Sequence, residues 1–137
     1  MTRTVIDTNV LICDTFEDTE FHKKAEEILE SLDRWYVPAI VVQEYVWFFK
    51  NSGFSAGEAL KALKGYTEDP RFKGLSEDPG IIKSALNFVV TEKLSLSRFN
   101  DAVILLHALE KGTLVTFDAK LRKLAKRRGI NVLPEEL

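Results

Sequence analysis

Close to its N-terminus the chain reads Thr4-Val5-Ile6-Asp7-Thr8-Asn9-Val10. A short β-branched run followed by a carboxylate and two small polar residues predicts a strand with Asp7 at its carboxyl end. Open α/β sheets bind their ligands at that end of their strands. Because an aspartate can equally be a turn residue that closes the strand, the meaning of Asp7 depends on acidic residues elsewhere in the chain.

Strand-like and helical patterns alternate through the rest of the chain, without a linker or a repeat. We expect further strands at 35–37, 72–76, 113–116 and 130–133, and helices within 21–32, 38–49, 55–66, 78–90, 98–111 and 119–128. Such alternation is typical of a mostly parallel sheet with helices on both faces. Right-handed crossovers then bring the carboxyl ends of the strands to one edge, so Asp7 and Asp118, which each follow a strand, are predicted to lie close together.

Several helix starts carry their own signals. Pro38 is suited to the first position of a helix, and Ser55 with Glu58 has the spacing of a capping box. Asp78 followed by Pro79 is a good start for another helix. The helix boundaries therefore follow from local chemistry as well as from periodicity.

Composition describes an ordinary globular protein. The chain has 137 residues, with 45% apolar and 29% charged residues, which fits a single domain over 1–137. The single cysteine, Cys13, excludes an internal disulfide and a multi-cysteine zinc site. No apolar run approaches the ~20 residues of a membrane span, and no signal peptide opens the chain. We therefore expect a cytoplasmic protein with no membrane partner.

The net charge of −2 neither favours nor excludes a nucleic-acid partner, but the charge is unevenly distributed. Eight acidic residues lie within 14–33, and six basic residues lie within 120–128 without an acidic one. The acidic stretch is typical of a solvated helix face. The basic block either complements the dipole at a helix end or binds phosphates.

Glu44 is the most unusual residue of the sequence. Its helical neighbours three and four positions away are all apolar: Ile40, Val41, Trp47 and Phe48. A carboxylate on an apolar helix face is costly to bury unless it is paired or binds a cation. The alternative is a glutamate at the rim of the sheet that accepts a hydrogen bond from a backbone amide.

Asp101 and Asp118 each have a structural explanation. Asp101 falls in the first turn of its helix, where the helix N-terminus stabilises a carboxylate, and Asp118 can cap the last helix. Together with Asp7 and Glu44, however, they can converge at one edge of the sheet, where their charges repel. A divalent cation removes that repulsion, and oxygen ligands without a cysteine cluster favour Mg²⁺ or Mn²⁺ over Zn²⁺. His107 lies on a different helical face from Asp101, so we expect it to pack or to lie on the surface.

In order and spacing the chain resembles the PIN-domain nucleases, in particular the small VapC-type toxins of prokaryotic toxin–antitoxin pairs. The resemblance rests on Val5-Ile6-Asp7-Thr8-Asn9, Gln43-Glu44, Asn100-Asp101-Ala102-Val103 and Thr116-Phe117-Asp118. Each motif is unspecific alone, but their order within a chain of this length makes the match strong. The resemblance covers nearly the whole chain, and all four acidic positions are present. It implies a three-layer α/β/α sandwich around a mostly parallel five-stranded sheet.

Carried over residue by residue, the resemblance implies an acidic site for Mg²⁺ or Mn²⁺ made of Asp7, Glu44, Asp101 and Asp118. Thr8 and Asn9 would orient Asp7 and its loop, while Thr116 would hydrogen-bond a metal-bound water or a neighbouring carboxylate. The implied chemistry is hydrolysis of a phosphodiester by metal-activated water, which leaves 3′-hydroxyl and 5′-phosphate ends. The implied partners are an RNA substrate, often tRNA or rRNA, and a cognate antitoxin.

Basic residues beside the implied site take on a second interpretation. The block after Asp118 contains Lys120 and Arg122, which are candidates to hold substrate phosphates. Arg98, one turn before Asp101, is a third candidate for a substrate contact. Basic residues of the block that point away from the site are expected to be ordinary solvated charges.

Residues 45–49 are five large apolar residues in succession. A helix cannot turn all five towards one core. Either the helix is deeply buried and packed on both sides, or part of the run is exposed or used in an interface. The family resemblance suggests a homodimer or a docked antitoxin for the second case.

Other functions remain alternatives. A PIN-domain nuclease can act in RNA processing outside a toxin–antitoxin pair, whereas a PIN scaffold that only binds RNA would have lost carboxylates. A receiver-type signalling domain also has an acidic Mg²⁺ pocket on a small α/β fold. It needs two adjacent acidic residues after the first strand, however, and Asp7 is followed by Thr8 and Asn9.

Overall fold

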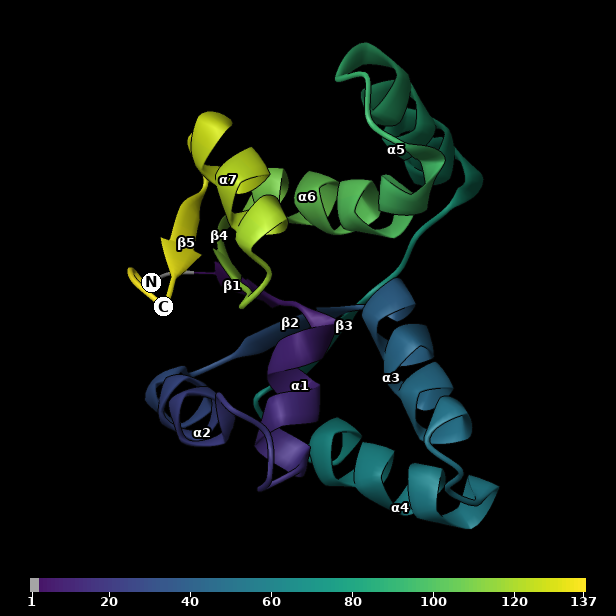
Figure 1. Ribbon diagram of the computed structural model, residues 1–137, viewed down its shortest axis with the longest axis vertical. Coiled ribbons are helices and arrows are strands. Elements are labelled where there is room, and N and C mark those ends of the chain that lie inside the picture. Colours follow the sequence, from purple (N-terminus) through teal and green to yellow (C-terminus); the bar gives the residue numbers. More distant parts are fainter. Residues whose placement is uncertain (1–2) are drawn as a thin grey trace.

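The computed structural model describes residues 3–137, and within that range five strands form one sheet in the order β3-β2-β1-β4-β5 (Figure 1). The strands are β1 (Arg3–Ile6), β2 (Trp35–Pro38), β3 (Phe72–Leu75), β4 (Gly112–Val115) and β5 (Asn131–Leu133). Every neighbouring pair is parallel. The predicted five-stranded α/β sheet is confirmed.

Helices connect the strands and cover both faces of the sheet (Figure 1). They are α1 (Thr8–Thr15), α2 (His22–Ser31), α3 (Ala39–Asn51), α4 (Ala56–Thr67), α5 (Pro79–Thr91), α6 (Phe99–Lys111) and α7 (Ala119–Arg127), with a short 3-10 helix η1 (Leu96–Arg98). Helices α1 to α4 lie on one side of the sheet and α5 to α7 on the other, which makes the three-layer sandwich. Among the residues that the structure describes, no helix is long and apolar enough to cross a membrane.

The strand order creates a switch point between β1 and β4. From β1 the chain continues through α1 and α2 to β2, whereas from β4 it continues through α7 to β5 on the opposite side. Ile6 pairs in register with Val115, so the residues that follow these two strands meet at the same edge. Ligands of open α/β sheets bind in the crevice at such a point.

The helix starts predicted at Ser55 and Asp78 are confirmed. Ser55 and Glu58 each accept a hydrogen bond from the other's backbone N–H, as in a capping box. Asp78 accepts a hydrogen bond from the Ile81 N–H at 2.8 Å. Pro38 differs by one position from the prediction, because it is the last residue of β2 and the N-cap of α3.

Helix α1 is not predicted by the sequence pattern. Its eight residues make only about two turns, and Thr8, Asn9 and Thr15 have low helix propensity, so periodicity gives little signal. Asp7 is its N-cap and accepts a hydrogen bond from the Thr8 N–H at 2.7 Å. The strong N-cap preference of aspartate was the available signal, and it turns the chain directly from strand into helix.

The apolar run at 45–49 divides between the core and the surface. Tyr45 and Phe49 are buried, whereas 41% of Val46 and 54% of Trp47 is exposed. The interpretation of a helix buried on both sides is therefore wrong for this chain. Part of α3 presents apolar surface next to the edge of the sheet where β1 ends.

Candidate active site

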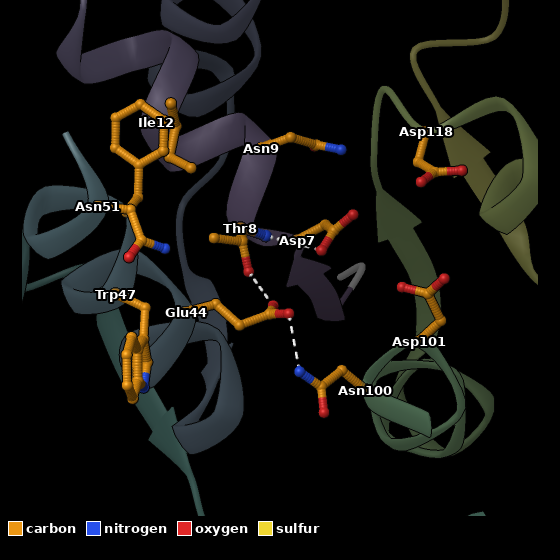
Figure 2. A pocket seen from close by; sticks show the side chains of 11 residues that line it. Asp7, Thr8, Asn9, Ile12, Glu44, Trp47, Asn51, Asn100, Asp101 and Asp118 are labelled. Carbon is orange, nitrogen blue, oxygen red and sulfur yellow. Dashed lines mark hydrogen bonds between the residues drawn. The ribbon is translucent and has the colours of Figure 1, made fainter. Parts of the chain in front are cut away.

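All four predicted acidic residues line one pocket of about 540 Å³ at the switch point (Figure 2). Asp7 and Asp118 follow β1 and β4, Glu44 comes from α3, and Asp101 comes from the first turn of α6. Figure 2 shows Glu44 across the pocket from Asp101 and Asp118, with Asp7 between them. The remaining walls are Thr8, Asn9, Ile12, Trp47, Phe48, Asn51 and Asn100.

Asp7 is the most buried of the four carboxylates, with 6% of the residue exposed. Its Oδ1 accepts a hydrogen bond from the Thr8 N–H, and its Oδ2 accepts one from the Thr116 hydroxyl at 2.7 Å. Burial raises the pKa of Asp7 to about 7, against the two hydrogen bonds that lower it, and the charges of Asp101 and Glu44 raise it further. The Asp7 carboxylate is thus held in place where the protein stabilises its charge poorly.

Thr116 and Asn9 fasten the loop after β4 to the start of α1. Thr116 Oγ1 donates to Asp7 and accepts a hydrogen bond from the Asp118 N–H at 3.1 Å. Asn9 Oδ1 accepts a hydrogen bond from the Phe117 N–H at 3.2 Å, and its Nδ2 lies 3.4 Å from Thr116 Oγ1. Of the two partners expected for Thr116, the structure shows the neighbouring carboxylate. These bonds fix the position of Asp118 relative to Asp7.

Glu44 is held by two neutral side chains. The Thr8 hydroxyl donates to Oε1, and Asn100 Nδ2 donates to Oε2 at 3.0 Å (Figure 2). The alternative partner, a backbone amide at the rim of the sheet, is not what the structure shows. Asn100 was not among the predicted site residues, although its place directly before Asp101 at the start of a helix was a usable signal.

Helix α3 is itself anchored by a residue that the sequence does not single out. Glu77 accepts hydrogen bonds from the N–H groups of Ala39 and Ile40 at 3.0 and 2.9 Å, which satisfies two donors of the first turn. Its Oε2 also lies 2.9 Å from Nε2 of His107, and both side chains are nearly buried. Of the two positions expected for His107, interior or surface, the structure shows the interior, and its pair with Glu77 joins α6 to the helix that carries Glu44.

Arg98 neutralises the other half of the pocket. Its guanidinium pairs with Asp101, and the same nitrogen lies 3.6 Å from Asp118 Oδ2. Asp118 uses its second oxygen, Oδ1, to cap α7 through the N–H groups of Lys120 and Leu121 at 2.9 and 3.0 Å. Burial raises the pKa of Asp101, and the pairing with Arg98 opposes that rise.

The donor set fits Mg²⁺ or Mn²⁺, which bind carboxylate oxygens and water. Within residues 3–137, no three His, Cys, Asp or Glu side chains lie close enough together to hold a metal ion as they stand. Neutral donors engage Glu44, and the guanidinium of Arg98 is the cation that contacts Asp101 and Asp118. Burial is the main cause of the raised pKa of Asp7, and the charges of Asp101 and Glu44 add to it.

The three predicted substrate contacts differ in position. Arg98 borders the acidic pocket through its two carboxylate partners, and Lys120 is exposed in the first turn of α7. Arg122 is only 5% exposed, and its guanidinium donates to the carbonyls of Thr116 and of residues 134–135. The prediction that Arg122 contacts the substrate is therefore corrected. Its guanidinium instead joins the C-terminal segment to the loop after β4.

Solved structures with a similar fold include VapC20, VapBC2 and FitAcB. VapC20 of Mycobacterium tuberculosis, a toxin that cleaves the sarcin–ricin loop, is 13% identical with a TM-score of 0.74, over 89% of this chain and 95% of that one. VapBC2 from Rickettsia felis, bound to a DNA fragment from its promoter, is 16% identical with a TM-score of 0.66, over 94% and 96%. FitAcB from Neisseria gonorrhoeae is 18% identical with a TM-score of 0.61, over 95% and 96%.

At these identities the structural likeness shows a shared fold. Among curated protein sequences, none matches the chain significantly. The profile of the PIN domain matches residues 4–127, which is nearly the whole chain and includes all four acidic residues of the pocket. The chain therefore belongs to the PIN domain family.

Proposed function

We propose that this protein is a metal-dependent endoribonuclease and the toxin of a VapBC-type toxin–antitoxin pair. Membership of the PIN domain family supports a nuclease and sets aside a receiver-type signalling domain. The likeness to VapC20 and VapBC2 supports a toxin role. RNA is the proposed substrate, as it is for the VapC-type proteins that the sequence resembles.

The observation that supports nuclease chemistry most strongly is the convergence of four carboxylates in one pocket. An acidic pocket repels a phosphodiester unless it also holds a cation. Asp7, Glu44, Asp101 and Asp118 would hold Mg²⁺ or Mn²⁺, and the bound ion supplies an activated water and stabilises the charge that develops on the phosphate.

The chain's own residues position this chemistry. Thr8 contributes to holding both Asp7 and Glu44, through its N–H and its hydroxyl respectively. Arg98 and Lys120, on the Asp118 side of the pocket, contact phosphates of the substrate. On the opposite wall, the half-exposed ring of Trp47, with Lys50 Nζ 4.0 Å from its centroid, offers aromatic surface to a base.

The proposal includes a cytoplasmic location, a homodimer and a cognate antitoxin. Two apolar surfaces are available for partners. On α3, Val46 and Trp47 are exposed, and on α5 the residues Ile82, Leu86 and Val90 form an exposed row at helical spacing.

The decisive test is cleavage of a fluorescently labelled RNA by wild-type protein and by Asp7→Asn, with Mg²⁺ or Mn²⁺. We expect ion-dependent cleavage that EDTA stops, and a loss of about 10²-fold or more in the variant. Asp18→Asn, which changes an exposed aspartate of the loop between α1 and α2, is the matched control and should cleave as wild type does. Equal rates for wild type and Asp7→Asn would end the nuclease proposal.

The metal assignment has its own test in Glu44→Gln. Glutamine keeps the carbonyl oxygen that accepts from Thr8 or Asn100 but removes the charge, so the fold should persist while Mn²⁺ binds about tenfold more weakly. Calorimetry of Mn²⁺ binding measures this. Unchanged affinity would remove Glu44 from the metal site.

A further inference from the structure

A second cavity, of about 530 Å³, lies between the outer face of α7 and the segment that leads from α5 into α6. We call it the basic groove. It is lined by Leu94, Arg98, Lys120, Lys123, Leu124, Lys126 and Arg127, so all of its polar side chains are cationic.

The charges of the groove are largely uncompensated. Arg98 pairs with the two aspartates of the acidic pocket, and Arg128, just outside the groove, lies 3.1 Å from Glu92. In the part of the chain that the structure describes, no carboxylate forms an ion pair with the three lysines or with Arg127. Like charges three and four residues apart on one helix destabilise it, so this surface favours an anionic ligand.

The helix dipole explains only two of the four cations that α7 contributes to the basic groove. Lys126 and Arg127 stand in the last turn of α7, where the helix dipole favours cations. Lys120 stands in the first turn, where the dipole disfavours a cation, and Lys123 lies in the middle of the helix, where the dipole has little effect. The basic block is therefore more than the complement of a helix terminus.

The groove also has apolar walls. Leu124 is almost buried and Leu94 is partly buried, and the two face the cavity from different segments. A site that combines cations with apolar surface fits a ligand that is anionic at one end and apolar at the other. A nucleotide has this combination in its phosphate and its base.

The groove adjoins the acidic pocket. Arg98 lines the groove while its guanidinium pairs with two carboxylates of the pocket, and Lys120 is only two residues beyond Asp118. From Lys120 to Arg127 the helix rises about 10 Å, which is longer than one phosphate group. A polynucleotide with one phosphate in the acidic pocket would meet this row as it continues.

We propose that the basic groove binds single-stranded RNA next to the scissile phosphate, with phosphates on the cations of α7 and a base against Leu94 and Leu124. This inference rests on the proposed function of the acidic pocket. RNA is favoured over an acidic protein segment because one continuous strand engages both cavities and the apolar walls together.

Binding is measured without catalysis by fluorescence anisotropy of a labelled oligouridylate in EDTA, over a series of salt concentrations. For Lys120→Gln/Lys123→Gln we expect about tenfold weaker binding, and a salt slope reduced by roughly 0.7 for each phosphate that the variant no longer neutralises. The matched control is Lys61→Gln/Lys83→Gln, which removes two exposed lysines of α4 and α5, and its affinity should change less than about twofold.

The outcomes separate this proposal from the nuclease proposal. If both lysine pairs affect binding equally, the groove has no special role, whether or not the protein cleaves RNA. If the groove variant loses affinity for a labelled oligoglutamate but not for the oligouridylate, the ligand is an acidic protein segment and the RNA assignment is overturned. If wild type binds RNA through the groove but never cleaves it with Mn²⁺, the nuclease proposal fails alone.

Discussion

The acidic pocket and the basic groove meet at Arg98, but they are built in opposite ways. The pocket takes its carboxylates from four distant segments, and hydrogen bonds from Thr8, Thr116 and Asn100 hold two of them in position. The groove takes most of its cations from one face of α7, and they extend into solvent without partners among the described residues. One surface is preorganised, whereas the other is adaptable.

This contrast determines what each surface is suited to do. Charges fixed in a partly buried pocket act strongly on a ligand at one defined point. Exposed lysines each contribute little, and their contributions add along a flexible polyanion. Single substitutions should therefore have large effects in the pocket and small ones in the groove.

Among the variants that compare the pocket with the groove, the largest loss of activity is expected for Asp118→Asn, and it should approach that of Asp7→Asn. Asparagine caps a helix as well as aspartate does, so the variant keeps the start of α7 and removes only the charge towards Arg98. We expect RNA cleavage to fall by about 10²-fold with little change in thermal stability. Initial rates with Mn²⁺ and a melting curve check both parts.

Lys120→Gln, two residues away, is the direct counterpart in the groove. Its cleavage rate at low substrate concentration should fall only several-fold, because it weakens one phosphate contact. If Lys120→Gln lowers the cleavage rate as much as Asp118→Asn does, the distinction between a fixed pocket and an adaptable groove does not hold.

The sequence predicts those site residues whose positions depend on their near neighbours in the chain. Asp7 and Asp118 are placed by the ends of β-rich runs, and alternation of elements brings those ends together. Glu44 stands out because its helical neighbours are apolar. The confirmed sheet and the acidic pocket both follow from such short patterns.

Other features depend on contacts that no short pattern encodes. Glu77 anchors α3 and pairs with His107, which lies 30 positions further along the chain, so its role is visible only in three dimensions. Arg122 resembles its basic neighbours in sequence, yet it belongs to the buried face of α7 with Leu121 and Ala125. Helical periodicity places Arg122 on that face, whereas its charge alone suggests a phosphate contact.

Asp7→Asn tests the burial of charge in the pocket through pH-dependent stability. The pKa of Asp7 is 3.8 in its ordinary state and about 7 in the fold. As pH rises between these values only the unfolded chain loses the proton, so the free energy of unfolding of wild type falls, and it is level again above the folded pKa. Without metal, Asp7→Asn should therefore be more stable than wild type by about 4 kcal/mol at high pH.

Urea denaturation in EDTA at several pH values measures this difference. The difference in the free energy of unfolding between the variant and wild type should shrink as the pH falls towards the ordinary pKa of aspartate. There Asp7 is protonated in both the folded and the unfolded wild type. A stability difference that is constant with pH would contradict a buried and poorly stabilised charge at Asp7.

Arg98→Met tests the residue at which the two surfaces meet. Methionine keeps much of the length of the side chain and removes the cation that pairs with Asp101 and Asp118. We expect Mn²⁺ to bind about tenfold more tightly, because it no longer competes with the guanidinium. Calorimetry measures the affinity. Weaker Mn²⁺ binding in the variant would mean that Arg98 holds the two aspartate side chains in position for the ion and does not compete with it.

The weakest effect should be that of Leu94→Ala, which removes apolar surface from the groove and leaves every charge. If a base lies against Leu94, an oligouridylate should bind about threefold more weakly, while inorganic polyphosphate, which has no base, should bind as it does to wild type. Anisotropy competition between the two polyanions measures the ratio within one experiment. An equal effect on both ligands would reduce the groove to a row of charges, and the apolar wall would then belong to the packing of α7 alone.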